Sequence, residues 1–233
     1  MHQARHKMKQ RQKLLDLESS IQRLSEELQE LRLQREVLSV GVMFNTTIWN
    51  VAAEYFRMFR YGVKVPETSA TTVLRPPMET QRHFLLSTMT SSVVSESGYG
   101  ADALMDNWSF VSRYHPDIDI QLTCLETTAD GFMVGRTLGR LTITGNTLRN
   151  AFPHLVDAEG QEQARLAGKM LGQQIAMRGA IEFEWDDSTR RIVRVQHKAD
   201  LLTPLLELLG SLEEVSRVFD NARVTPESTV AIS

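Results

Sequence analysis

The residues best suited to chemistry are cations clustered near the N-terminus. Arg5, Lys7, Lys9, Arg11 and Lys13 are five of the chain's 26 Lys and Arg residues, and none of its 29 acidic residues lies among residues 1 to 13. A short basic segment on an otherwise acidic chain is typical of a local contact with a polyanion. A solvated tail is the alternative explanation of the same charges.

The sequence gives little support to catalytic chemistry. His115 and Asp117, with Asp106 nearby, could form an acid–base pair, but His115-Pro116-Asp117 is more typical of a turn before a strand. Cys124 is the single cysteine, which excludes an internal disulfide and a Cys-x-x-Cys metal site. Its alternating apolar surroundings predict a buried thiol. We therefore expect no catalytic residues, no metal site, no cofactor and no enzyme activity.

A narrow stripe of apolar residues follows the basic segment. Its members recur at alternating spacings of three and four, the period of 3.5 that is typical of the contact edge of a coiled coil. The stripe consists of Leu14, Leu17, Ile21, Leu24, Leu28, Leu31 and Leu38, and Arg35 occupies the remaining seam position. These residues predict a long α-helix whose zipper, residues 14 to 40, pairs two copies in a parallel coiled coil. The alternative is a hairpin with a later helix of the same chain.

The basic segment continues the helical frame of the stripe, and together they resemble the basic leucine zipper (bZIP) transcription factors. In that family a basic residue precedes the first zipper leucine by nine residues, as Lys7 precedes Leu17 here. The resemblance implies binding in the major groove of double-stranded DNA. By this analogy phosphates are contacted by Arg5, Lys7, Lys9 and Arg11, and bases by Gln3, Ala4 and His6. The family's base-reading Asn would align before Met1, so residues 1 to 13 are expected to be a partial basic region.

The segment after the zipper makes the resemblance to the bZIP family more specific. Residues 39 to 42 and 46 to 57 are similar to the junction in an expanded bZIP set of oomycetes. This implies a nuclear, DNA-binding transcription regulator that forms a homodimer, or a heterodimer with other bZIP proteins. Two alternatives remain. The chain could be a zipper-only interaction protein that pairs with full-length relatives and blocks their DNA binding, or a small-molecule binder or enzyme that carries a zipper.

Residues 41 to 62 predict an amphipathic helix. Thr46 or Thr47 is suited to be its N-cap and Gly62 to be its terminator. The positions expected to face a core are Trp49, Ala52, Ala53, Phe56 and either Phe59 or Arg60. Residues 63 to 79 contain three prolines and many small polar residues, which indicates a linker.

Residues 80 to 222 predict an α+β domain, and residues 223 to 233 a C-terminal tail. Helices are expected near 84 to 89 and at 103 to 114, 146 to 152, 162 to 173, 202 to 209 and 212 to 219; strands are expected at 118 to 124, 132 to 144, 175 to 185 and 190 to 197. This order indicates helices around a curved antiparallel sheet of at least four strands. The last hairpin and its following helix resemble the NTF2-like cone fold. No apolar run approaches the roughly 20 residues that cross a bilayer, so no membrane contact is expected.

Overall fold

The computed structural model describes residues 47–63, 76–156 and 160–229, and seven separate residues nearer the N-terminus (13, 17, 20, 21, 23, 24 and 27). The chain divides into two compact units, Met1–Thr46 and Thr47–Ser233. The seven described residues of the first unit are helical and exposed. The rest of the predicted zipper helix lies outside the described residues, as does most of the predicted linker.

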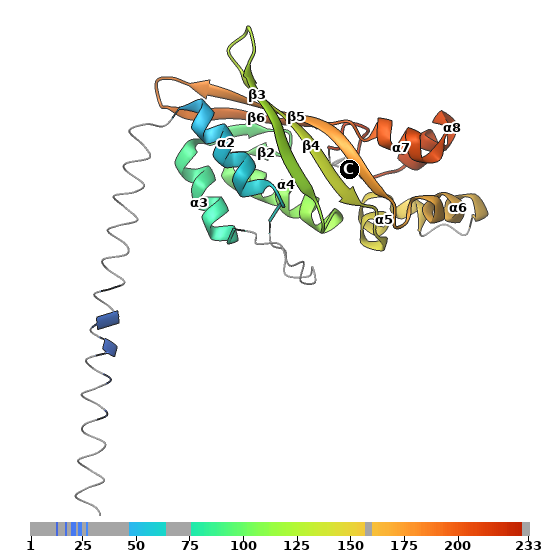
Figure 1. The fold of residues 1–233 in the computed structure, drawn as a ribbon, viewed down its shortest axis with the longest axis horizontal. Helices are drawn as coiled ribbons and strands as arrows, with labels where there is room; N and C mark the ends of the chain where they lie inside the picture. Colours follow the sequence, from blue (N-terminus) through green and yellow to red (C-terminus); the bar gives the residue numbers. More distant parts are fainter. Residues whose placement is uncertain are drawn as a thin grey trace, which may run out of the picture. The chain divides into compact units, whose positions relative to one another are not determined.

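The second unit is an α+β fold (Figure 1). Its elements are α2 (Ile48–Phe59), α3 (Met78–Thr88), β1 (Met89–Ser95), β2 (Gly98–Tyr99), α4 (Gly100–Tyr114), β3 (Asp119–Thr127), β4 (Met133–Thr142), α5 (Gly145–Ala151), a 3-10 turn η1 (Pro153–Leu155), α6 (Gln161–Met170), β5 (Gln174–Asp186), β6 (Arg191–Ala199), α7 (Leu202–Leu209) and α8 (Leu212–Phe219).

The described strands form one six-stranded sheet in the order β2-β1-β6-β5-β4-β3. Strands β3, β4, β5 and β6 pair antiparallel with one another in that order, and the hairpin predicted across residues 186 to 189 is confirmed as β5 and β6. The four expected strands are therefore antiparallel as predicted, but the sheet as a whole is mixed, because β1, which the sequence did not predict, pairs parallel with β6. The sequence pattern also places Met89 at the end of a helix, whereas it begins β1.

Helix α2 begins at the predicted cap, because the Thr47 side chain accepts a hydrogen bond from Asn50 N at 3.3 Å. Its buried face carries Tyr55 and Phe56, with Val51, Ala52, Met58 and Phe59. Trp49 and Ala53 are exposed, so their predicted core positions are wrong. The turn after the helix uses Gly62 at φ +69, where a Cβ would lie 2.3 Å from Ser112 Oγ.

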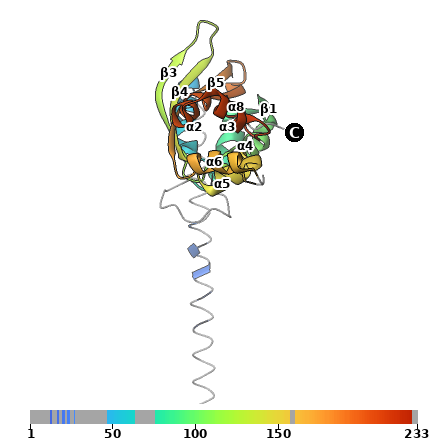
Figure 2. The same cartoon turned by 90° about the vertical axis from the view of Figure 1, so that its right-hand side faces the viewer.

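Two hydrophobic cores occupy different ends of the sheet. The first lies under α2, α3 and α4 and is rich in aromatic residues, including Tyr55, Phe59, Trp108 and Phe183. The second joins the Thr142 end of β4 and the Gln174 end of β5 to α5, α6, α7 and α8. Figure 1 shows α2 to α4 toward one end of the long strands and α5 to α8 at the other. Figure 2 is turned so that the second end faces the viewer, with α5, α6 and α8 in front.

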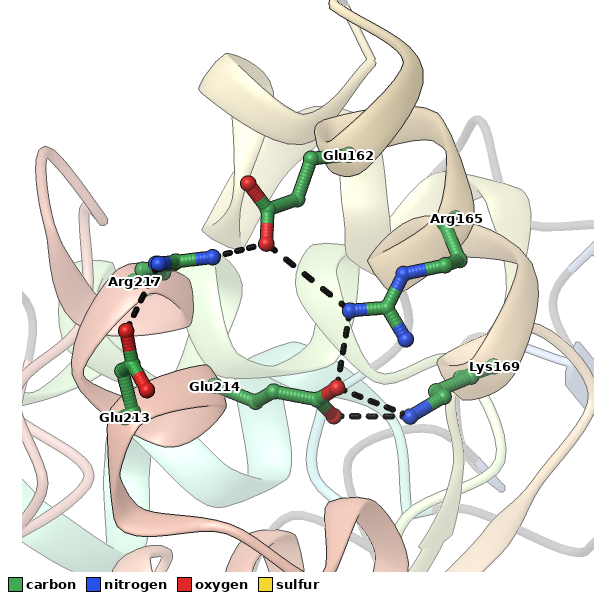
Figure 3. Close-up of polar contacts among 6 residues, drawn as sticks. All are labelled: Glu162, Arg165, Lys169, Glu213, Glu214 and Arg217. Carbon is green, nitrogen blue, oxygen red and sulfur yellow. Dashed lines mark hydrogen bonds and ion pairs between the residues drawn. The ribbon is translucent and has the colours of Figure 1, made fainter.

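Charged side chains join α6 to α8 on the surface of the second core (Figure 3). Glu214 accepts hydrogen bonds from Arg165 at 2.8 Å and Lys169 at 2.8 Å. Arg217 bridges Glu162 and Glu213. Exposed ion pairs contribute little individually, so this network mainly fixes how the two helices are aligned over their shared apolar residues.

Candidate functional site

A chain of hydrogen bonds connects four elements inside the first core. Trp108 Nε1 on α4 donates to Tyr55 Oη on α2 at 2.9 Å, and Tyr55 Oη lies 2.8 Å from His197 Nε2 on β6. Glu96, between β1 and β2, accepts from the His197 backbone amide at 2.7 Å, and its Oε2 lies 3.6 Å from His197 Nδ1. We call Trp108, Tyr55, His197 and Glu96 the relay.

One donor of the relay is fixed by its chemistry: an indole N–H only donates, so Tyr55 Oη accepts from Trp108. We assign the phenol proton to His197 Nε2, because the opposite tautomer would leave this buried proton without an acceptor among the described residues. A neutral imidazole then carries its proton on Nδ1, which faces the carboxylate of Glu96. Since Nε2 is occupied by Tyr55, the imidazole is placed to hold the phenol rather than to take a proton from a bound molecule.

Burial sets the electrostatics of the relay. Tyr55 is fully buried, and burial raises the pKa of its hydroxyl above the ordinary 10, so the phenol stays neutral. Burial alone would raise the pKa of Glu96. Contact with the His197 imidazole, and then with nearby backbone amides, outweighs burial and holds that pKa below the ordinary 4.5.

Two members of the relay, Trp108 and His197, also line a cavity of about 90 Å³. That volume accommodates several water molecules or a small organic group. Its walls come from α4, β3, β4, β5, β6 and the segment that follows α8. They are largely apolar: Trp108, Val111, Ile118, Ile120, Met177, Ala180, Ile181 and Ala199. Polar groups enter from Asn107, Thr137, His197, Lys198, Glu227 and Ser228.

The acid–base candidates of the sequence do not reach this cavity. His115 and Asp117 form the predicted turn, where Ile118 N donates to His115 O at 3.2 Å, and Asp117 accepts from Thr142 N at 3.0 and 3.1 Å. Asp106 is exposed. None of these three acid–base candidates lines the cavity. Burial lowers the pKa of His115 to about 4, so its neutral form is favoured at neutral pH.

The prediction of a buried Cys124 is wrong, because the thiol is exposed. Strand β3 pairs Leu122 with Thr137 but Cys124 with Arg136, so Thr123 is an extra residue in the ladder. Such a bulge shifts the phase of the alternation. Leu125 therefore packs on the core in place of Cys124.

The predicted DNA-contacting residues all lie outside the described residues: Gln3, Ala4, Arg5, His6, Lys7, Lys9 and Arg11. The same holds for the seam residues Leu14, Leu28, Leu31, Arg35 and Leu38. Three seam residues are described. Leu17, Ile21 and Leu24 are helical and between 56 and 61% exposed.

Sequence reasoning missed three members of the relay. Trp108 is predicted on the apolar face of its helix, but Tyr55, Glu96 and His197 are not singled out. A tyrosine within an aromatic helix indicates a core position, and its hydroxyl needs a buried partner, so Tyr55 does carry a signal. Glu96 and His197 are 101 positions apart, and nothing in the local pattern of either residue indicates the other.

Neither a metal-binding cluster nor a membrane-spanning helix occurs in the described part of the chain. Its Asp, Glu, His and Cys side chains do not gather in a group of three or more that could bind a metal ion. Among its helices, none combines the length and apolar character that a bilayer-spanning segment requires.

Comparison with known families gives a match over residues 49–114 to the bZIP transcription factor 1 C-terminal domain. The matched region runs from α2 through α4 and so includes Tyr55, Glu96 and Trp108. It covers less than a third of the chain. No curated protein matches the chain.

Comparison with solved structures gives several alignments of low identity. A SnoaL-like polyketide cyclase from Agrobacterium tumefaciens aligns at 13% identity and a TM-score of 0.45, over 70% of this chain and 98% of its own. TsrD from Streptomyces laurentii aligns at 12% identity and 0.42, over 70 and 97%. An NTF2-like protein of unknown function from Exiguobacterium sp. aligns at 13% identity and 0.41, over 64 and 98%. We draw no functional conclusion from these alignments.

Proposed function

We propose that this protein is a transcription regulator of the bZIP type that binds double-stranded DNA as a dimer in the nucleus. The match of residues 49–114 to the bZIP transcription factor 1 C-terminal domain carries the proposal. That match lies outside the zipper, so it supports the transcription-factor interpretation independently of the N-terminal pattern.

The N-terminal residues supply the second argument. The seam from Leu14 to Leu38 has the period of a two-stranded coiled coil. Its described members Leu17, Ile21 and Leu24 are exposed in the single chain, where a partner helix would cover them. A homodimer, or a heterodimer with another bZIP protein, removes this apolar surface from water.

DNA binding would follow from the basic residues that precede the seam. In a forked dimer the basic segments of both chains enter the major groove. Phosphate contacts by Arg5, Lys7, Lys9 and Arg11 would then supply salt-dependent affinity, and Gln3, Ala4 and His6 would face base edges. The proposal contains no catalytic step, because Tyr55 occupies His197 Nε2 in the relay.

The test is a titration of the whole chain into labelled duplexes carrying palindromic bZIP half-sites, and into scrambled duplexes, at two salt concentrations. We expect tighter binding to the palindromes and an affinity that falls with salt. A double variant, Lys7→Gln with Lys9→Gln, should reduce the salt slope by about 0.9 for each phosphate that the chain no longer neutralises. Its charge-matched control is Arg113→Gln with Arg149→Gln, on exposed positions of α4 and α5.

Weak binding that ignores sequence and vanishes with salt would contradict the proposal. It would favour the second candidate, a zipper-only interaction protein that pairs with full-length bZIP relatives and blocks their DNA binding. That candidate predicts that adding the chain to a full-length bZIP protein releases the latter from its palindrome.

A further inference from the structure

Gly139 of β4 lines the cavity and leaves space where a side chain would otherwise lie. On the inner face of the sheet, Thr137 and Gly139 of β4 lie opposite Gly179 and Met177 of β5. A third inward glycine, Gly135, has a different neighbour: the Phe56 ring fills its place, and a Cβ there would lie 2.3 Å from two ring atoms. The fold thus fills the space at Gly135 with the Phe56 ring and leaves the space at Gly139 open.

Two polar side chains at the cavity have no partner among the described residues. Thr137 is only 9% exposed, and within the described part of the chain its hydroxyl makes no hydrogen bond. The Asn107 amide, on α4, likewise has no hydrogen-bond partner there. Buried polar groups are nearly always hydrogen-bonded, so the Thr137 hydroxyl at the cavity wall is suited to bind water or a ligand. Asn107 is half-buried, and its amide adds a second polar group at the cavity.

The remaining lining indicates what kind of ligand would fit. Trp108, Ile118, Ile120 and Ile181 present apolar surface. The lining also contains one cation and one anion, Lys198 and Glu227, so it gives no net preference for a charged molecule. Ligand sites of this design combine apolar walls with a few placed polar groups that fix orientation.

We propose that this cavity binds a small, uncharged, mostly apolar molecule whose hydroxyl or carbonyl group hydrogen-bonds Thr137 and Asn107. The apolar part of the molecule lies against Trp108 and Ile181. The relay supports the site from behind, because it holds the Trp108 indole by its N–H. Ligand binding at this position adds to the proposed DNA-binding function and does not depend on it.

Phenol and benzene are a suitable pair of probes, because they differ by a single hydroxyl group. The assay follows backbone amide NMR shifts of the whole chain during titration. We expect saturable shifts at Gly139, Ala180 and Ala199, which line the cavity. The affinity for phenol should be about three- to tenfold above that for benzene, as one hydrogen bond provides. Shifts that do not saturate, or that spread over the surface, would overturn the proposal.

Two variants separate the contribution of the Thr137 hydroxyl to binding from the contribution of the cavity volume. Thr137→Val removes the unpaired hydroxyl and should abolish the preference for phenol over benzene. Gly139→Val fills the cavity and should lower the affinity for both phenol and benzene at least tenfold. Its backbone can accept a side chain, since a Cβ at Gly139 meets no atom closer than 3.8 Å.

The matched control is Gly145→Val at the start of α5, where a Cβ meets nothing within 4 Å. It should bind both probes as the original chain does. Unchanged phenol binding in folded Gly139→Val, confirmed by its amide spectrum, would show that phenol binds elsewhere and would refute the site. Failure of DNA binding in the earlier titration would leave this result unaffected.

Discussion

Replacement of Tyr55 by phenylalanine tests the relay most directly, because it removes one oxygen atom and keeps the ring. Tyr55 is fully buried and Trp108 is 3% exposed. Without the phenol, Trp108 Nε1 loses its acceptor in a place that water reaches poorly. His197, whose side chain is 21% exposed, can recover a hydrogen bond from water.

The magnitude follows from this difference. A buried donor left unsatisfied costs about 1–3 kcal/mol, and the partly exposed imidazole adds little. We therefore expect Tyr55→Phe to lower the free energy of unfolding by about 2 kcal/mol. For a domain of this size that corresponds to a fall in Tm of roughly 4–8 °C.

Urea unfolding followed by tryptophan fluorescence and circular dichroism is the assay. The midpoint should fall while the slope of free energy against urea stays constant, because the surface exposed on unfolding does not change. Tyr99→Phe is the control, since Tyr99 is 77% exposed, and it should shift stability by less than about 0.5 kcal/mol. An equally small effect of Tyr55→Phe would refute the claim that the relay stabilises the fold.

Three further predictions concern the zipper and the response to pH. Leu24→Pro should abolish pairing through the seam, because proline in a helix interior costs about 3 kcal/mol or more; an unchanged dimer in sedimentation would mean that other surfaces hold the protomers together. The pKa of His115 is lowered to about 4 from 6.5, so the unfolded chain binds the proton more tightly and stability falls as the pH drops from 6.5 to 4. His115→Asn should remove about 1–3 kcal/mol of that loss, and identical pH profiles of the two proteins would contradict it. The lowered pKa of Glu96 stabilises the fold above pH 4.5, and this contribution disappears as the pH falls below that value. Glu96→Gln should therefore flatten the dependence of the free energy of unfolding on pH in the acidic range. A dependence as steep as that of the unmodified chain would count against the contact with His197.

The parts of the fold that the sequence predicts are those set by short-range patterns. The β5–β6 hairpin has alternating apolar residues on both strands, and Asp186 accepts from Ser188 and Thr189 in the turn between them. Helix α2 is capped by Thr47, and Gly62 forms the turn that follows it. Local capping and turn chemistry decide these boundaries, so a single sequence suffices.

The features that escape prediction depend on distant partners. Strand β1 consists largely of serine, threonine and valine and becomes a strand by pairing with β6, about 100 residues further along the chain. The exposure of Cys124 depends on a bulge at Thr123, which the alternation of β3 conceals. The place of Thr137 at the cavity wall follows from the pairing of β4 with β5, which the local pattern of β4 does not indicate.

The parallel pairing of β1 with β6 has a consequence for the order in which the protein can fold during synthesis. Met89 finds its partner Ile192 only after more than 100 further residues have been made. Until then α2, α3 and α4 have apolar faces but lack most of the sheet that covers them. The region matched by the family model is thus unable to complete its own core. A ribosome-bound chain ending before residue 191 should expose that surface to chaperones, and emergence of β6 should be the event that releases it.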